Sequence, residues 1–502
     1  MKASTQLAPT YYDTVIVGGG SAGAVLAARL SEDTSRCVLL LEAGPAYDPS
    51  HFPKLLTDPN HSGGDDLHDW GYVSEPGFLG HPIQLRRGKV LGGSSTTNAG
   101  VAIRARPADF DRWRSWGVSG WSFEKVLEVF KRLENMPSGD EQWHGRSGPF
   151  PIRQPAVETL TPSCQAFVAS AGRVGLTRLD DFNGAEQHGV GPHPRNVVDG
   201  VRRSVAMTYL TESVLARPNL TVRGDTDVDC ALFEGTRAIG VRLVDGRIEL
   251  ADETILAAGV YGTPGILLRS GIGPANQLRG LDIPVVADLP VGRRLVDHPF
   301  VYTVHALTRD STQMKPAVGA LAWTRSEDAA PDELDLQIAA THFFDPALSP
   351  TGGAIVLAVA VTLPDSVGSL TLASRDPRAA PRINLNFLGE ARDRRRLLEG
   401  IDLARRIART PPLRDLVEHE LTAEADLMSN LRSYHHATST VPMGGDGNSA
   451  AVVDSLGVVR GIQGLRVVDA SIFPEIPSAP TNLTVIMAAE HIAARITDTD
   501  PR

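Results

Sequence analysis

Cysteine is scarce in this chain of 502 residues, which has only Cys37, Cys164 and Cys230. The three are widely spaced and none belongs to a C-x-x-C pair, which excludes a disulfide framework and a cysteine zinc site. We therefore expect three buried free thiols, as in proteins of a reducing compartment. No metal site is predicted.

Long apolar runs are also missing. The longest, AIVLAVAVTL at 354–363, is far short of the roughly 18 to 20 residues that a membrane span requires, and it is typical of a core strand. The N-terminal segment has one lysine and no apolar run before residue 13, which is not the pattern of a secretory signal. These features predict a cytoplasmic protein with no membrane partner.

An excess of positive charge is absent as well. The chain has 49 basic and 59 acidic residues and a formal net charge of −10. This balance predicts no nucleic-acid partner. At 502 residues the chain exceeds the size of a single core, so we expect two domains or one large composite.

A strand, a glycine turn, a helix and a second strand follow one another between residues 13 and 44. In the turn, Gly18 permits the tight bend, Gly20 lets the backbone approach a pyrophosphate, and Gly23 permits close packing of helix on strand. Glu42 ends the second strand, where a carboxylate accepts hydrogen bonds from an adenosine ribose. The unit predicts dinucleotide binding, and the acid disfavours NADP.

A second glycine-dense segment, RRGKVLGGSSTTNAG at 86–100, contains four glycines and one asparagine, Asn98. Such a loop can lay its backbone N–H groups against a ring or a phosphate. A flexible loop without a ligand would have the same composition, so the residues alone leave both interpretations open.

Seven blocks of the chain, in order, resemble the glucose–methanol–choline (GMC) oxidoreductases, which are FAD-dependent alcohol oxidases and dehydrogenases. The blocks are VIVGGGSAGAVLAARLSED, VLLLEAG, GKVLGGSSTTN, ADFDRWRSWG with HGRSGP, YGTPGILLRSGIGP, LPVGRRLVDHP, and HHATSTVPMG with GLRVVDASIFPEIPSAPTN. They cover nearly the whole chain. The resemblance is therefore highly specific.

The resemblance implies an α/β (α+β) fold, in which a discontinuous Rossmann-like FAD-binding domain holds an inserted substrate-binding domain built on an antiparallel sheet. We expect the FAD-binding domain at 1–155, 200–300 and 440–502, and the substrate-binding domain at 156–199 and 301–439. The implied FAD-binding residues are Gly18, Gly20, Ser21, Ala22, Gly23, Glu42, Ala43, Trp70, Val90, Gly93, Ser94, Asn98, Ala99, Val228, Asp469, Ala470 and Asn482.

The resemblance also sets the catalytic register. The family's base is a histidine seven residues before a Met-Gly pair, which here is Met443-Gly444 and assigns the base to His436. His435 is one residue out of register. If the segment is extended, neighbouring side chains point to opposite faces, so we expect His435 to turn away from the flavin and to act at most as a support.

The family's second catalytic group, a histidine or asparagine, falls on Pro480, 44 residues after His436. A proline ring neither donates nor accepts a hydrogen bond. A water, His435 or Asn482 could supply the missing contact. Proline at this position resembles pyridoxine 4-oxidase-like members of the family, which act on a heteroaromatic primary alcohol.

The predicted function is therefore FAD-dependent oxidation of a small, (hetero)aromatic primary alcohol to its aldehyde. His436 would act as general base, and hydride would pass to flavin N5. The electron acceptor is O2 or another acceptor, with an oxidase preferred to a dehydrogenase. A hydroxynitrile-lyase-like, non-redox use of the same fold is the alternative.

Three points remain open from the sequence. His68 and His81 in the connecting arm leave covalent attachment of the flavin possible. His342, Phe343 and Phe344 are candidates to line the substrate pocket, although a plain core strand fits them equally. The oligomeric state is expected to be a monomer or a small homo-oligomer.

Overall fold

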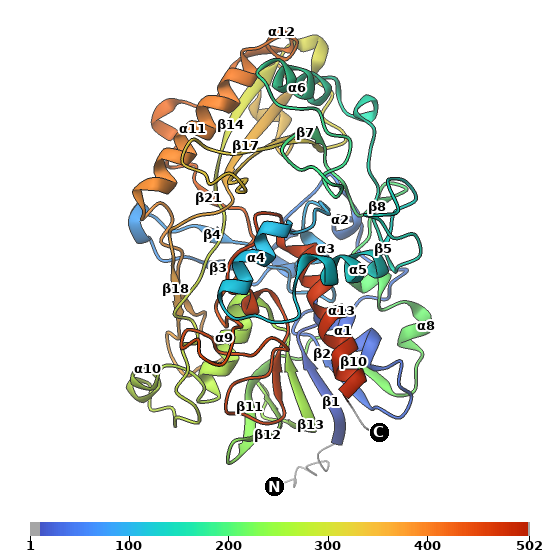
Figure 1. The fold of residues 1–502 in the computed structure, drawn as a ribbon, viewed down its shortest axis with the longest axis vertical. Coiled ribbons are helices and arrows are strands. Elements are labelled where there is room, and N and C mark those ends of the chain that lie inside the picture. Colours follow the sequence, from blue (N-terminus) through green and yellow to red (C-terminus); the bar gives the residue numbers. More distant parts are fainter. Residues whose placement is uncertain (1–10, 500–502) are drawn as a thin grey trace.

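Two sheets organise the molecule, one in the lower half of Figure 1 and the other in the upper half. The structure is a computed structural model that describes residues 11–499. In the first sheet, the neighbouring strands β10, β2, β1 and β13 are parallel to one another. β12 and β11 continue the sheet beyond β13 as antiparallel strands. β22 also pairs with β13, in parallel. Its seven strands are β1 (Tyr11–Val17), β2 (Val38–Leu41), β10 (Leu220–Arg223), β11 (Val228–Glu234), β12 (Arg237–Leu243), β13 (Ile248–Leu256) and β22 (Leu465–Val467).

The second sheet is antiparallel throughout, in the order β20-β14-β17-β16-β15-β7, with β21 paired to β14. Every residue of β15, β16 and β17 is buried, because helices cover one face and the rest of the chain covers the other. Its strands are β7 (Gly189–Pro192), β14 (Pro299–Leu307), β15 (Val318–Thr324), β16 (Leu336–Thr341), β17 (Ala354–Val361), β20 (Val417–Glu420) and β21 (Arg432–Ser433).

The longer helices pack on these sheets and on each other. α1 (Gly23–Leu30) contacts α13 (Thr481–Thr499), which also contacts α5 (Phe123–Leu133), and α9 (Gly259–Arg269) contacts β11. On the second sheet, α11 (Ala391–Ala408) contacts β16 and β17, and α6 (Pro162–Arg173) contacts β15. α11 fits closely because a Cβ at Gly400 would lie 2.6 Å from the Cγ1 of Val359.

Shorter elements connect the two sheets. The other helices are α2 (Lys54–Thr57), α3 (Ser94–Thr97), α4 (Pro107–Ser115), α7 (Val205–Thr208), α8 (Glu212–Leu215), α10 (Ala275–Gly280) and α12 (Leu413–Leu416). The other strands pair as β3 (Tyr72–Val73) with β4 (Gln84–Leu85), β5 (Glu134–Asn135) with β6 (Phe150–Pro151), β8 (Val197–Val198) with β9 (Val201–Arg202), and β18 (Ser369–Thr371) with β19 (Arg382–Asn384).

The predicted fold class is confirmed: a parallel-core sheet is combined with an antiparallel sheet. The apolar run at 354–363 is strand β17 and its continuation, as expected. First-sheet strands lie within 11–41, 220–256 and 465–467, and second-sheet strands within 189–192 and 299–433. On this basis we propose the same domain boundaries as above.

One expectation about the cysteines is wrong. Cys164 and Cys230 are buried free thiols, but Cys37 is exposed. Cys37 immediately precedes β2, and its backbone N–H donates to Asp13 at 2.7 Å, so it lies where the strand begins rather than in the core. Within residues 11–499, no helix is long and apolar enough to cross a membrane.

A buried ionic cluster holds the connecting arm in place. His144 lies 2.9 Å from Glu134 through Nδ1 and 2.8 Å from Asp181 through Nε2, and Arg104 contacts the other oxygen of Glu134 at 2.7 Å. Burial alone would lower the pKa of His144, but the hydrogen bonds to Asp181 and Glu134 outweigh it and raise that pKa. The imidazolium form therefore stabilises the fold.

We expect His144→Leu to destabilise the protein by about 3 kcal/mol in acid, because Glu134 and Asp181 both lose the imidazolium that lies between them, although Glu134 keeps Arg104. The folded-state pKa lies above the unfolded value, so this stabilisation is complete below about pH 6.5 and is lost as the pH rises through the folded pKa. Thermal unfolding midpoints of both proteins from pH 5 to pH 9 measure the difference.

His305→Leu is the matched control. Burial lowers the pKa of His305 to about 4, so its neutral form is the stabilising one and the deficit of its variant should shrink in acid. A deficit of His144→Leu that shrank in acid in the same way would contradict the assigned role.

Candidate functional site

The glycine turn between β1 and α1 is shaped by backbone contacts. Gly18 has φ +97°, and a Cβ at Gly23 would lie 1.8 Å from the carbonyl oxygen of Gly18, so the third glycine is required for packing. At Gly20 a Cβ would meet only Gly93 Cα, at 3.8 Å. Gly20 therefore leaves open space in front of the N-terminus of α1.

Glu42, at the end of β2, faces the same space. Its carboxylate accepts hydrogen bonds from the backbone N–H groups of Gly19 and Gly44, each at 2.8 Å. Burial raises the pKa of Glu42 to about 7, against the lowering effect of these two N–H groups. Each oxygen keeps a lone pair for a further donor such as a ribose hydroxyl.

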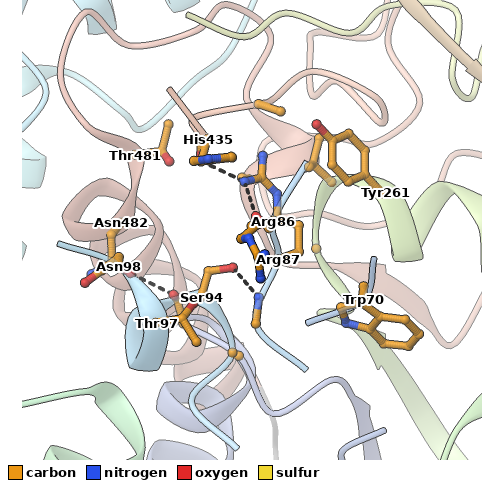
Figure 2. Close-up of a pocket in the computed structure, with 18 of the residues that line it drawn as sticks. Trp70, Arg86, Arg87, Ser94, Thr97, Asn98, Tyr261, His435, Thr481 and Asn482 are labelled. Atoms are coloured by element: carbon orange, nitrogen blue, oxygen red, sulfur yellow. Dashed lines mark hydrogen bonds between the residues drawn. The ribbon is translucent and has the colours of Figure 1, made fainter. Parts of the chain in front are cut away.

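The segment 86–100 docks on this turn. The Gly92 N–H donates to the Gly19 carbonyl at 2.7 Å, and a Cβ at Gly93 would lie 2.7 Å from Gly20 Cα. The Ser94 hydroxyl accepts from the Gly88 N–H at 3.1 Å, which ties the loop to the first turn of α3, as Figure 2 shows. The segment is therefore a folded loop rather than a flexible one.

Two C-terminal residues complete this side. Asp469 accepts from the Gly259 N–H at 2.9 Å and from the Thr263 hydroxyl at 2.6 Å, which fixes the start of α9. Asn482, in the first turn of α13, accepts from the Ser21 hydroxyl at 2.7 Å. The N-termini of α1, α9 and α13 therefore meet at one place.

All these segments line a single cavity of about 640 Å³ (Figure 2). Of the expected FAD-binding residues, only Gly23 and Val90 do not line it. Gly23 packs on Gly18, and the Val90 carbonyl accepts from the Gly93 N–H at 2.7 Å, so both shape the loops. The others line the cavity: Gly18, Gly20, Ser21, Ala22, Glu42, Ala43, Trp70, Gly93, Ser94, Asn98, Ala99, Val228, Asp469, Ala470 and Asn482.

His436 lines the same cavity and is held from behind. Its Nδ1 lies 3.0 Å from Nδ1 of His298, and Asp297 Oδ1 accepts from the backbone N–H of both histidines, at 2.9 Å and 2.8 Å. Burial, followed by the charges of His298, His435 and Arg87, keeps the pKa of His436 well below its usual range. The imidazole is therefore neutral near pH 7.

The expectation that His435 turns away from the cavity is wrong. His435 has φ +65° and is not extended, because the Ser433 hydroxyl accepts from its backbone N–H at 2.9 Å and forms a tight turn. His435 lines the cavity that His436 also lines, and Arg87 donates to the His435 carbonyl at 3.2 Å (Figure 2). Burial, then Arg87 and Arg86, lower the pKa of His435 to about 3.

Pro480 also lines the cavity, directly before α13, and offers no hydrogen bond at this position. Neither His68 nor His81 lines the cavity. Within residues 11–499, no group of three or more histidine, cysteine or acidic residues could hold a metal ion.

The opposite wall is one face of the second sheet. Phe300 and Tyr302 of β14 line the cavity, together with Gln337, Ala339 and Thr341 of β16 and Val356 and Ala358 of β17. Of the three aromatic candidates, Phe343 lines it. His342 instead faces α6, where its Nε2 lies 2.8 Å from the Thr161 hydroxyl, and Phe344 packs in a small cluster against Val304.

Several residues of the site were not identified from the sequence. Asp297 and His298 belong to the family block LPVGRRLVDHP, and no further signal in the sequence distinguishes them. Arg87 and His193 carried no local signal. They reach the cavity only through tertiary packing.

Comparison with known proteins identifies the family. Residues 12–300 and 364–489 match the two parts of the GMC oxidoreductase family model. The chain is 35% identical to 5-(hydroxymethyl)furfural oxidase of Methylovorus sp. (strain MP688), over 97% of this chain and 99% of that protein. It is also 35% identical to oxygen-dependent choline dehydrogenase of Ectopseudomonas mendocina (strain ymp), over 98% and 94% of the two chains.

Among solved structures, pyridoxine 4-oxidase from Mesorbium loti superposes with a TM-score of 0.89 at 31% identity, over 97% of this chain and 100% of that one. The predicted resemblance and the predicted cofactor are thereby confirmed. The chain belongs to the GMC oxidoreductases, the FAD-dependent enzymes that oxidise CH–OH groups.

Proposed function

We propose that this enzyme oxidises a small (hetero)aromatic primary alcohol to the aldehyde, with His436 as general base. The observation that carries the proposal is a neutral imidazole facing a cavity with aromatic side walls and no acidic side chain on its substrate side. A neutral histidine accepts the proton of an alcohol, and such a cavity suits an uncharged ring.

The shape of the substrate wall supports a flat substrate. Ala339 lies directly opposite Ala358 across β16 and β17, and Tyr302 lies opposite Ala358 across β14. Two adjacent alanines leave a shallow floor, and Phe300 and Tyr302 form its aromatic side. A planar ring fits between such groups better than a branched chain does.

Charge argues against a cationic substrate such as a quaternary ammonium. The acidic residues that line the cavity are Glu42, Asp227 and Asp469, and all three belong to the first-sheet side. The second sheet contributes none to the wall. Relatives described as oxidases of 5-(hydroxymethyl)furfural and pyridoxine support a ring alcohol.

The residues of this chain hold and move one proton. The alcohol O–H donates to Nε2 of His436, while Nδ1–H of His436 donates to Nδ1 of His298, which keeps Nε2 free to accept. Asp297 holds both histidine backbones and so fixes the ring that receives the proton. FAD, when bound, supplies the acceptor for the hydride of the carbinol carbon.

Because Pro480 supplies no hydrogen bond, the alkoxide oxygen has to be held by another group. His435 is the support we propose, since its ring lines the same cavity. Asn482 is less suited because its Oδ1 already accepts from Ser21. A water is the remaining candidate.

The chain also fits FAD. Gly20 and Gly93 leave a backbone-walled space at the N-terminus of α1, which is suited to a pyrophosphate, and Glu42 lies at the end of β2 for a ribose. We further propose O2 as electron acceptor, a monomer or small homo-oligomer, and a cytoplasmic location, the last because all three cysteines are free thiols.

His436→Ala should lower the rate of flavin reduction by an aromatic alcohol about 10²-fold or more, because the proton loses its acceptor. Anaerobic stopped-flow bleaching of the flavin band measures this rate. His435→Ala is the matched variant and should cost less. A larger loss in His435→Ala would transfer the role of base to His435, and no bleaching by any aromatic alcohol in the native enzyme would favour the lyase alternative.

The pH profile provides a separate test. Because the pKa of His436 is lowered, its neutral form persists from pH 8 down to about pH 6.5, and the reduction rate should fall only below that value. Rates measured anaerobically from pH 5 to pH 9 give the profile. A decline that began above pH 7 would contradict a neutral base.

Gly20→Ala should fold normally and lose most of its FAD, because the new Cβ occupies the cavity and touches nothing closer than 3.8 Å in the chain. Gly23→Ala should instead lower the unfolding midpoint, because its Cβ would lie 1.8 Å from the Gly18 carbonyl. The ratio of flavin to protein absorbance and a thermal melt separate the two effects. Full flavin content in Gly20→Ala would refute the assigned position of the pyrophosphate.

A further inference from the structure

Two polar side chains lie on the cavity wall that the second sheet forms, and the proposed reaction uses neither. Thr341 ends β16, and His193 directly follows β7; both line the cavity, and their exposures are 9% and 3%. β15 lies between them. Val318 of β15 pairs with Thr341, and the Gly319 carbonyl accepts from the backbone N–H of His193 at 3.2 Å.

The histidine ring has a defined donor and acceptor. Its Nδ1 lies 3.3 Å from the Gly319 carbonyl, which can only accept, so Nδ1 carries the hydrogen and Nε2 is an acceptor. Burial lowers the pKa of His193 to about 4, so the ring is neutral near pH 7. His193 thus presents one bare acceptor to the cavity.

Within residues 11–499, neither Nε2 of His193 nor the Thr341 hydroxyl makes a hydrogen bond. The neighbouring His342 differs, since its ring nitrogens reach the Thr161 hydroxyl and the Ala354 carbonyl, each at 2.8 Å. Both unpaired atoms are accessible from the cavity, since neither is among the buried unpaired polar atoms of the described residues, so a ligand group can reach them. An unpaired acceptor and an unpaired hydroxyl on one cavity wall therefore point to a ligand group.

The two side chains flank the same strand, β15, on one wall of the cavity, so one substituent of a bound ring can lie near both. A hydroxyl can donate to His193 and accept from Thr341 at once, whereas a methyl or a carboxylate cannot do both.

This pair lies at the end of the sheet face remote from His436. Gln337 marks the near end, since it pairs with Ala360, which in turn pairs with Phe300. The Phe300 ring lies 5.0 Å from that of Tyr434, and Tyr434 lies 4.8 Å from His436. Thr341 is four residues further along β16, about 13 Å away. A ring whose reacting carbon faces His436 therefore turns its other end toward His193 and Thr341.

We propose that His193 and Thr341 form a specificity site for a second hydroxyl group of the substrate, on the side of the ring remote from the reacting carbon. The preferred substrate is therefore an aromatic alcohol that bears a further hydroxymethyl or phenolic group. This inference rests on the proposed oxidation of an aromatic alcohol and names the substituent that selects among such alcohols.

The test compares substrates that differ by one oxygen. 1,3- and 1,4-benzenedimethanol are compared with 3- and 4-methylbenzyl alcohol by anaerobic flavin reduction in the native holoenzyme. After correction for its two equivalent hydroxyls, each diol should be preferred by about tenfold or more in reduction rate over apparent Kd, since two neutral hydrogen bonds are gained. The preference for the diols should appear mainly as a lower apparent Kd rather than as a faster flavin reduction.

Variants test whether Thr341 and His193 cause the preference for the diols. Thr341→Val and His193→Phe should each reduce the ratio of diol to methyl substrate several-fold, and the double variant should bring it close to one. Thr341→Ser and His193→Gln, which keep a hydroxyl and an acceptor, should restore part of it. Thr371→Val, on the exposed strand β18, is the matched control and should leave the ratio unchanged. Flavin content and thermal midpoints verify folding.

The outcomes separate the two proposals. A native preference for the diols that falls in both variants and is partly restored in the conservative ones supports the inference. Bleaching by all four alcohols with no preference, or a preference that both variants retain, overturns the inference and leaves the proposed function standing. An absence of bleaching by any of the four alcohols overturns the proposed function, and the inference with it.

Discussion

The structure depends on a backbone-to-backbone contact between two glycine loops. Gly93 approaches Gly20 so closely that a Cβ on Gly93 would lie 2.7 Å from Gly20 Cα, and the Gly92 N–H bonds to the Gly19 carbonyl. Only residues without a side chain permit this approach. The contact joins segments about seventy residues apart and leaves beside Gly20 an open space at the N-terminus of α1, which is suited to a phosphate group.

A second constraint positions the chemistry. Asp297 is buried, and burial raises the pKa of its carboxyl, while Arg87, the Ser433 hydroxyl and two backbone N–H groups oppose that rise. These contacts join the segment before β14 to the segment that carries both cavity histidines. Since the carboxylate bonds to the backbone rather than to either ring, His436 keeps its ring nitrogens for His298 and for the cavity.

The substrate wall follows from the pairing of the second sheet. Residues directly opposite one another in an antiparallel sheet share a face. Phe300 and Gln337 both pair with Ala360, and Tyr302 and Ala339 both pair with Ala358, so these side chains point toward the same cavity. Helices α6 and α11 cover the other face, which receives His342. Alternation therefore separates cavity residues from core residues within one strand, and it explains why Phe343 and His342 face different surroundings.

The sequence by itself determined the fold class, and it led to the glycine turn, Glu42 and His436, which the structure places on one cavity, because each depends on local spacing or on an ordered series of motifs. The role of His436 as base stays a prediction. The sequence also indicated α11 and β17 through their apolar patterns. It failed at His435, where extended geometry was assumed and a hydroxyl-capped turn with φ +65° was found, because Ser433 competes locally for the backbone. It failed at Cys37 because exposure depends on where in the fold a strand begins.

Only the tertiary structure decided what surrounds His436, the proposed base. Four residues that are distant from His436 in sequence reach the site through contacts that no local pattern encodes. The His298 ring nitrogen lies 3.0 Å from that of His436, and Asp297 accepts from two backbone N–H groups. Arg87 donates to a carbonyl, and His193 reaches the cavity from the edge of the sheet. The physical reason is that local spacing fixes which residues share a turn or a face, whereas the pairing of remote strands fixes which faces meet.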